Sequence, residues 1–375
     1  MIIIERIEKT FKDLFPLNRS LTGKDVKKTL NYIKNNFLSE ADIKKTSSGT
    51  KVFDWQIPDE WNINDAYVKN VNGEKIIDFK KNNLNVISYS SPIDMIVEKD
   101  ELLKHLFTLP NHPNWIPYRT SYYDRNWGFC CTQKLVDSNK FKGPFEVFID
   151  SSFNTKGNLN WLEYLKPGKI KDEILISTYC CHPSMGNDNL SGMVLWILLL
   201  RYLKSIKTKF SYRFIIIPET IGAISYLSEN KNNLEKVFAG FELTCVAGPN
   251  EFVYNSSFLE KHVIDRITIK TLNELNLKFK EKKFKPIGSD ERQYSSPGFR
   301  IPIVLLCKDQ FHDYDFYHTS SDNLDFISSK SLLESYILYK KIIQNLEKLD
   351  KSEMEVENKT KNTKSKFSFY STLNP

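Results

Sequence analysis

Four residues whose side chains could bind or assist a metal ion lie in loops at the ends of apolar segments or before the final helical segment. His182 and Asp188 belong to the stretch CCHPSMGNDNLSG, which follows the run EILISTY. Glu219 follows the run YRFIIIP, and His318 lies in the polar stretch DFYHTSSDNLDF. Zinc in hydrolytic sites takes nitrogen and carboxylate ligands and needs a carboxylate base beside its water. The pattern predicts a zinc-hydrolase site in which Glu219 is the general base and the other three residues are ligands.

Each of these residues also has an ordinary structural interpretation. A single loop histidine is most often a packing or surface residue, and an acid at a strand end is often a helix N-cap. Cys180 and Cys181 stand beside His182 and could be soft zinc ligands. They end an apolar strand, however, where small buried side chains are common. The metal site is favoured because the four residues occur together at topologically suitable places.

Residues of the stretch SDERQY could orient a metal ligand or contact the substrate next to the metal. Asp290 could orient a ligand histidine, although capping a helix is an equally ordinary role for it. Arg292 and Tyr294 are predicted to contact the substrate.

A second predicted recognition patch lies in the aromatic stretch IPYRTSYYDRNWGFC. Arg119 and Tyr123 are predicted substrate contacts, with Tyr118 and Tyr122 beside them. A guanidinium group binds carboxylates through two parallel hydrogen bonds, and a tyrosine offers both a ring and a hydroxyl. Packing at a domain junction is the alternative role of such an aromatic cluster.

The elements that must position these residues form an alternating pattern from Phe145 onward. The runs FEVFID, EILISTY, YRFIIIP, VFAGFEL and IPIVLLC are predicted strands, separated by helical segments, the last of which runs from about residue 329 to 349. Near-continuous apolar strands separated by helices indicate an α/β sheet covered on both faces. Reactive groups of such sheets collect beyond the carboxyl ends of the strands, where Glu242 also lies.

The sequence also predicts how the chain divides into domains. Residues 1–48 and 111–350 are predicted to form the main domain, which begins with two helices separated near Pro16. Short alternating runs such as NDAYVKNV, EKIIDF and NVISY predict an inserted β-rich domain over residues 49–110. Residues 351–375 are polar and are predicted to be a disordered tail.

Composition limits the classes of partner. The chain has 375 residues and a net charge of +7, but no basic stripe interleaves with aromatic residues, so we expect neither a nucleic-acid nor a membrane partner. The six cysteines lack a CxxC spacing, and the N-terminus lacks the apolar run of a secretion signal, which favours the cytoplasm. Assembly into a homo-oligomer is left open.

The run HPSMGNDNLSG resembles the metal-binding loop of the dinuclear zinc aminopeptidase and carboxypeptidase superfamily. In that superfamily a histidine is followed by an Asp-x-x-Ser-Gly element whose aspartate bridges the metals, and Asp188 begins such an element. Three further segments, PETIGAISY, SDERQYSSPGFRIPIVLL and YHTSSDNLDF, resemble the segments that carry the general base, a Ser-Asp run and the last histidine ligand. The resemblance implies a three-layer α/β, zinc exopeptidase-like fold with a mixed, mostly parallel sheet and a small inserted β-rich domain.

A closer resemblance covers nearly the whole chain. It is similar to a bacterial aminopeptidase-like family with an inserted domain of unknown function, whose members are often encoded among polysaccharide-biosynthesis genes. The motifs that carry it are LNRSLTG, VFDWQIPDEW, NDAYV, IPYRTSYY, WGFC, STYCCHPSMGNDNLSG, PETIGAISYL and SDERQYSSPG.

One departure from the superfamily pattern affects the expected metal site. The superfamily places a second, zinc-binding glutamate directly after the general base, whereas Thr220 follows Glu219 here. By position Glu242 resembles the superfamily's acidic ligand on the following strand. We therefore expect one zinc ion at His182, Asp188 and Glu242, with His318 closing that shell or holding a weaker second ion.

The resemblance implies a zinc-dependent amide hydrolase. The expected substrate is a short peptide or a small molecule, namely an acylated amino-sugar intermediate of surface polysaccharide biosynthesis. Intramolecular amide chemistry, such as cyclisation, is a variant of the amide-hydrolase hypothesis. A non-catalytic, zinc-holding binding or regulatory module is the alternative, and Thr220 is the feature that favours it.

Overall fold

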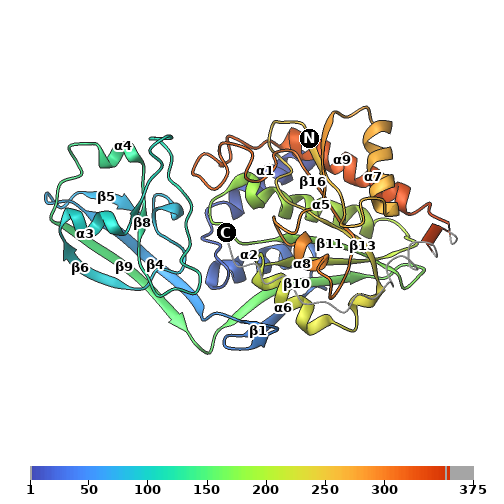
Figure 1. Cartoon of the computed structure of the whole chain (residues 1–375), viewed down its shortest axis with the longest axis horizontal. Helices are drawn as coiled ribbons and strands as arrows, with labels where there is room; N and C mark the ends of the chain where they lie inside the picture. The colour runs from blue at the N-terminus through green and yellow to red at the C-terminus, as the bar shows by residue number, and fades with distance from the viewer. Residues whose placement is uncertain (1, 351–352, 355–375) are drawn as a thin grey trace.

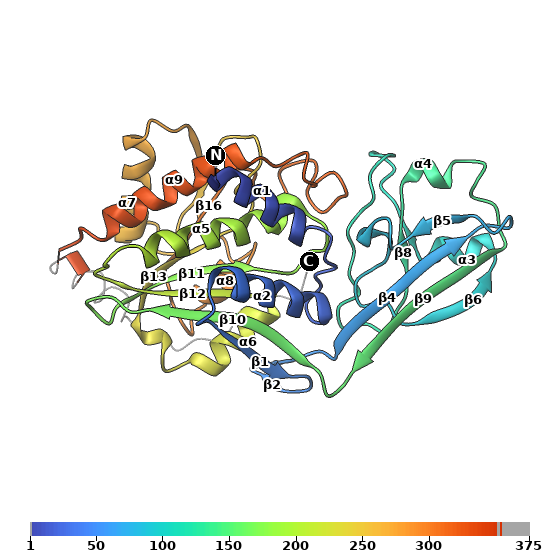
Figure 2. The same ribbon diagram turned by 180° about the vertical axis from the view of Figure 1, so that it is seen from behind.

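The computed structural model describes residues 2–350 and 353–354 and shows two lobes (Figure 1). The larger lobe is built on an eight-stranded sheet, and the smaller lobe on a four-stranded sheet. Long strands connect the two lobes at one side of the molecule (Figure 2). Apart from residues 353–354, the predicted tail lies outside the described residues.

The main sheet is mixed, with a parallel centre. Its strands are, in spatial order, β1 (Asp42–Ser47), β10 (Asn158–Lys166), β12 (Ser211–Ile217), β11 (Glu173–Tyr179), β13 (Val237–Glu242), β16 (Ile303–Cys307), β14 (Phe252–Asn255) and β15 (Phe279–Lys282). The four central strands β12, β11, β13 and β16 run parallel, so their carboxyl ends meet at one edge. Strands β10 and β14 flank this centre in antiparallel pairing.

Helices cover both faces of the main sheet. One face carries α1 (Ile2–Leu14), α2 (Lys24–Phe37), α5 (Gly192–Lys204), α7 (Val263–Glu274) and α9 (Ser329–Leu346), and the other carries α6 (Ile221–Asn230) and α8 (Glu291–Tyr294) (Figure 2). Successive strand residues point to opposite faces, so Ile174 and Ile176 pack in the first core and Leu175 in the second. The predicted three-layer architecture is confirmed.

The smaller lobe has its own apolar core, which includes Trp61, Val68 and Phe145. Its sheet is antiparallel, in the order β5 (Lys75–Asp78), β4 (Glu60–Lys69), β9 (Phe145–Asn154) and β6 (Ile93–Val97). The pair β7 (Leu106–Phe107) and β8 (Phe129–Cys130), with α3 (Lys99–Lys104) and α4 (Gln133–Val136), completes this lobe, and the hairpin β2 (Lys51–Val52) and β3 (Trp55–Gln56) precedes it.

Two sequence-based assignments of strands were wrong. The run FEVFID was placed with the main sheet, but it forms β9, which pairs with β4 and β6 of the smaller sheet. The run NVISY was predicted to be a strand, but Val86 and Ser88 make only isolated bridges. Strand β9, with β8 and α4, lies in the smaller lobe beyond residue 110 (Figure 1); the domain boundaries themselves remain a prediction. Within the described residues, no helix combines the length and apolarity needed to cross a membrane.

Candidate metal centre and active site

The loop after β11 and the loops near it bring the predicted ligands together. Strand β11 ends at Tyr179, and the following loop carries His182 and Asp188 before α5 begins at Gly192. A Cβ atom at Gly192 would lie 2.2 Å from the carbonyl oxygen of Leu243, so only glycine allows α5 to start this close to the end of β13. His318 reaches the same place from the loop between β16 and α9.

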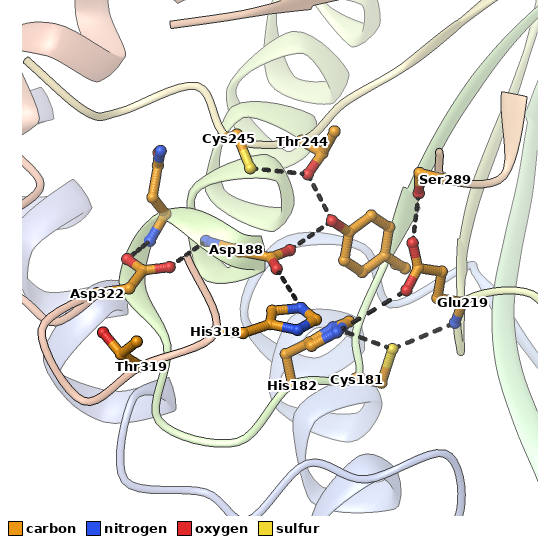
Figure 3. Close-up of polar contacts among 12 residues, drawn as sticks. Cys181, His182, Asp188, Glu219, Thr244, Cys245, Ser289, His318, Thr319 and Asp322 are labelled. Carbon is orange, nitrogen blue, oxygen red and sulfur yellow. Dashed lines mark hydrogen bonds and ion pairs between the residues drawn. The ribbon is translucent and has the colours of Figure 1, made fainter. Parts of the chain in front are cut away.

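His182, Asp188 and His318 form a cluster that could hold a metal ion (Figure 3). One ligand atom from each lies within 4.8 Å of the other two. The Nε2 atom of His318 is 3.1 Å from Oδ2 of Asp188, and the two imidazole ring centres are 5.0 Å apart. Both histidines have positive φ, 76° at His182 and 55° at His318, a backbone conformation that is rare for residues other than glycine and frequent at functional sites.

Asp188 is held in place by hydrogen bonds that leave one carboxylate oxygen free. The Tyr179 hydroxyl donates to Oδ1 at 2.5 Å. Asp322 accepts the backbone N–H groups of Asn187 and Asp188 at 2.6 and 2.9 Å, which fixes the loop. Burial alone would raise the pKa of the Asp188 carboxyl, but the neighbouring His182 and His318, with the Tyr179 hydroxyl, hold it well below its usual value.

Two buried atoms in this cluster are without hydrogen-bond partners among the described residues. These are Oδ2 of Asp188 and Nε2 of His318, whose close approach lacks hydrogen-bond geometry. A buried polar atom without a partner is costly, and buried charges are ordinarily paired or bound to metals. Burial lowers the pKa of His182, which favours the neutral imidazole that binds metals. The donor set and the free atoms therefore fit a zinc ion.

Glu219 lies beside this cluster, on the side of His182 (Figure 3). Its Oε2 is 3.8 Å from Nε2 of His182, and its Oε1 accepts a hydrogen bond from the Ser289 hydroxyl at 2.7 Å. Burial raises the pKa of Glu219, while the neighbouring His182 opposes that shift. A raised pKa suits a carboxylate that must take up a proton and release it again.

Glu242 lies outside the cluster that the structure brings together. It belongs to neither group of described residues whose ligand atoms converge. Its side chain is fully buried, and both carboxylate oxygens lack a hydrogen-bond partner within the described residues. Burial, and then the nearby Asp290, raise its pKa well above the usual value. Its role as a zinc ligand remains a prediction, and the convergence of ligand atoms within the described residues includes His318 but not Glu242.

Asp290 contacts the backbone next to Glu219, the predicted general base. Its Oδ1 accepts the N–H of Thr220 at 2.7 Å, and Thr220 has a φ of 62°. This bond holds the turn that follows Glu219. Asp290 is also the N-cap residue of α8, but its side chain makes no capping hydrogen bond there. Its predicted role in orienting a ligand histidine remains a prediction. Tyr294 is fully buried and bonded to Ser177 at 3.0 Å, which argues for a structural role and against the predicted substrate contact. Arg292 is half-buried, and its role remains a prediction.

The predicted recognition patch divides between two places. Tyr118 lies against the two histidines of the candidate ligand cluster, with its ring centre 5.2 Å from that of His182 and 5.1 Å from that of His318. Arg119 is exposed and lies over the ring of Phe107. Tyr123 lines a cavity of about 210 Å³, together with Gln56, Asp59, Tyr89, Tyr122, Arg125 and others. The substrate contacts predicted for Arg119 and Tyr123 remain predictions.

Several residues around the site were missed by the sequence analysis. Tyr179 and Asp322 position Asp188, and the ring of Tyr317 stacks on His318 at 3.9 Å. Arg19, although far away in the sequence, is fully buried and donates to the carbonyl oxygen of His182 at 3.3 Å. Tyr317 is adjacent to His318, and that adjacency could have drawn attention to it. The contacts of Arg19 and Asp322 have no local sequence signal.

Comparison with protein families identifies the chain's relatives. A family model described as a domain of unknown function, DUF4910, matches residues 8–349. The chain belongs to the DUF4910 family.

A curated relative and a crystal structure, both from Clostridium acetobutylicum, extend this result. One, provisionally named a polysaccharide biosynthesis protein with an aminopeptidase-like domain, is 44% identical over 341 residues, which are 91% of this chain and 77% of the relative. A crystal structure of a protein provisionally described as a peptidase has a TM-score of 0.88 and 43% identity, covering 92% of this chain and 80% of that chain. The predicted membership of an aminopeptidase-like family linked to polysaccharide biosynthesis is confirmed.

More distant structures share the fold of this DUF4910 protein. A zinc aminopeptidase from Bacillus subtilis has a TM-score of 0.66 at 13% identity, with 93% of this chain and 96% of its own covered. At that identity the likeness shows the fold alone. The predicted zinc exopeptidase-like fold is thereby confirmed.

Proposed function

We propose that this protein is a zinc-dependent amide hydrolase. The observation that carries the proposal is the convergence of His182, Asp188 and His318 beside Glu219, with a buried ligand atom on Asp188 and on His318 that makes no hydrogen bond within the described residues. The aminopeptidase-like fold and the aminopeptidase-like relative support it. Zinc held at this cluster would polarise a carbonyl group and lower the pKa of a bound water molecule.

Glu219 is the proposed general base and acid. As a carboxylate it removes a proton from the attacking water, and as a carboxylic acid it returns that proton to the leaving amine. The hydrogen bond from Ser289 to Oε1 leaves Oε2, which faces His182, available for this proton. Asp290 keeps Glu219 in position through the N–H of Thr220.

The substrate is proposed to be a short peptide or an acylated amino-sugar intermediate. The provisional name of the Clostridium acetobutylicum relative supports the second class, because it refers to polysaccharide biosynthesis. Both classes contain the amide bond that this chemistry cleaves. Tyr118, which lies against both histidine rings, is placed to contact the group next to that bond.

The test is a substrate panel measured with and without a chelator. Short peptides and N-acylated amino sugars are offered to wild-type protein and to Glu219→Gln. We expect chelator-sensitive cleavage by the wild type, and a loss of roughly 10²- to 10⁴-fold in the variant because proton transfer is removed. The variant should still bind zinc, since Glu219 is not a proposed ligand. A variant that remained fully active would contradict the assignment of the base.

A second candidate function is a non-catalytic, zinc-holding binding or regulatory module. It is favoured by Thr220, which stands where the superfamily has a second metal-binding glutamate. The same panel separates the two functions. Tight, zinc-dependent binding of a panel member without any cleavage would support the module and contradict the hydrolase.

A further inference from the structure

The two ring nitrogens of His182 face different partners. Nε2 is the nitrogen nearer Glu219, at 3.8 Å from its Oε2. Nδ1 lies 3.4 Å from the sulfur of Cys181 in hydrogen-bond geometry. A histidine that binds a metal through one nitrogen donates the N–H of the other to a fixed acceptor, commonly a carboxylate or a carbonyl oxygen. At His182 the observed contact of that second nitrogen is a sulfur atom.

The same sulfur also contacts the segment that carries the general base. The backbone N–H of Glu219 donates to Sγ of Cys181 at 3.3 Å (Figure 3). Cys181 is 2% exposed, so water does not compete for these contacts. It follows the end of β11, next to the end of β12 that leads to Glu219. One buried sulfur thus links the loop of a proposed ligand to the loop of the proposed base.

The backbone at His182 has an uncommon conformation. His182 has a φ of 76°, so its side chain leaves the chain in a direction that few residues adopt. Pro183 and Ser184 follow it, and neither offers a carboxylate to the ring. The sulfur is therefore placed to decide both the orientation and the tautomer of the imidazole.

We propose that Cys181 is a positioning residue of the metal centre. Its sulfur accepts the Nδ1–H of His182, which leaves Nε2 unprotonated for the metal, and it accepts the N–H of Glu219, which sets the position of the base. The inference rests on the proposed function, because it takes His182 as a metal ligand.

Direct ligation by the sulfur is the rival interpretation of the same contacts. Cys181, His182 and Glu219 also offer ligand atoms within 4.8 Å of one another. The two ring nitrogens Nδ1 and Nε2 point in diverging directions, however. A sulfur atom that is hydrogen-bonded to Nδ1 therefore cannot also coordinate an ion that is bound to Nε2. Ligation by all three residues would also remove Glu219 from its role as base.

The test compares zinc affinity, by competition with a chelator, in wild type, Cys181→Ala, Cys181→Ser and Cys180→Ala. Cys180 is the matched control, because it is also buried but packs in the apolar core between the main sheet and helices such as α1 and α5. We expect a loss of about 10- to 100-fold for Cys181→Ala, the effect typical of removing such a partner. Cys181→Ser should recover part of the loss, since a hydroxyl also accepts the N–H, and Cys180→Ala should bind as the wild type does.

Cobalt substitution supplies a readout that simple packing would not change. Wild-type protein loaded with Co²⁺ should show no sulfur-to-cobalt charge-transfer band in the near ultraviolet, because the sulfur is not a ligand. A band that disappears in Cys181→Ser would overturn the inference in favour of ligation. Unchanged zinc affinity in Cys181→Ala would overturn it while leaving the proposed function intact. Wild-type protein that binds no zinc would overturn the proposed function, and this inference with it.

Discussion

Asp188 is the residue on which the proposed site depends most. Its Oδ1 is taken by Tyr179, its loop is fixed by Asp322, and its Oδ2 is left without a hydrogen-bond partner among the described residues. The environment keeps this carboxylate ionised, as a metal ligand must be. Helix capping is the ordinary alternative role of such an aspartate. That role does not account for a buried second carboxylate oxygen that makes no hydrogen bond.

The identity of the third ligand can be tested at the residue scale. His318→Ala should weaken zinc binding by more than about 100-fold. Even the loss of a residue that only hydrogen-bonds to a metal ligand typically lowers metal affinity by about 10- to 100-fold. Glu242→Gln should change the affinity little, since Glu242 lies outside the converging group. Calorimetric titration of both variants with zinc checks this. A large loss of affinity in Glu242→Gln and a small one in His318→Ala would contradict this choice. That result would favour the ligand set His182, Asp188 and Glu242.

The residue types of the site were predictable, but their grouping was only partly so. His182, Asp188 and His318 converge as expected because their loops follow strands or precede a helix at one edge of the sheet. The position of Glu242 was inferred from its place at a strand end. A strand end fixes where the backbone lies, but no local pattern specifies which neighbours the buried Glu242 side chain has.

At the scale of elements, the parallel strands β12, β11 and β13 determine where the loops of the site begin. The register pairs Tyr179 with Ile217, so the loops that carry His182 and Glu219 leave the sheet side by side. A buried ion-pair cluster joins β12 to β11 and to β10 near the other end of β11 and β12. Arg213 of β12 bonds to Glu173 of β11 at 2.5 and 2.9 Å and to Glu163 of β10 at 2.5 Å.

Removal of the Arg213 charge should destabilise the sheet strongly. Arg213→Met leaves Glu173 buried without its partner, and breaking a buried pair in this way costs about 3–5 kcal/mol. The matched control is Lys44→Met on the edge strand β1, whose ion pair with Asp42 is exposed and should be worth less than about 1 kcal/mol. Urea unfolding measures both. Equal effects of the two substitutions would contradict the assigned role of the cluster.

Element types were predictable from sequence periodicity, whereas the partners of one strand were not. The apolar runs that became β11, β12, β13 and β16 were assigned correctly because strands buried on both faces have a distinctive composition. The run that became β9 looks the same locally. It pairs with β4, more than seventy residues earlier, through contacts that its own sequence does not encode.

At the scale of the whole molecule, a short segment with Ile116 and Tyr118 connects the smaller lobe to the loop that carries His318. The N–H of Tyr118 donates a hydrogen bond to the carbonyl oxygen of His318 at 2.8 Å. The N–H of Ser320 donates one to the carbonyl oxygen of Ile116, also at 2.8 Å. The Ser320 hydroxyl accepts the N–H of Ile116 at 2.9 Å. The two lobes are therefore connected at a proposed metal ligand as well as through the long strands (Figure 2).

Zinc binding should therefore stabilise the contact between the lobes. Fixing His318 to a metal should slow hydrogen exchange at the amides of Tyr118 and Ser320, because local opening of this contact would require the ligand to leave. The amide of Val71, bonded to Lys142 within the smaller lobe, is the control and should not change. Exchange followed by mass spectrometry or NMR, with and without zinc, measures the difference. Uniform slowing over both lobes, or none at Tyr118 and Ser320, would contradict this coupling.

The central claim is that one zinc ion lies among His182, Asp188 and His318, with Glu219 beside it. Diffraction from zinc-containing crystals at the zinc absorption edge tests it most directly, because the anomalous difference map locates the ion independently of any assumed chemistry. We expect a peak within bonding distance of these three residues, about 2.0–2.2 Å from each ligand atom, and not bonded to Glu219. A peak coordinated by Glu242 in place of His318, or no peak at this cluster, would contradict it.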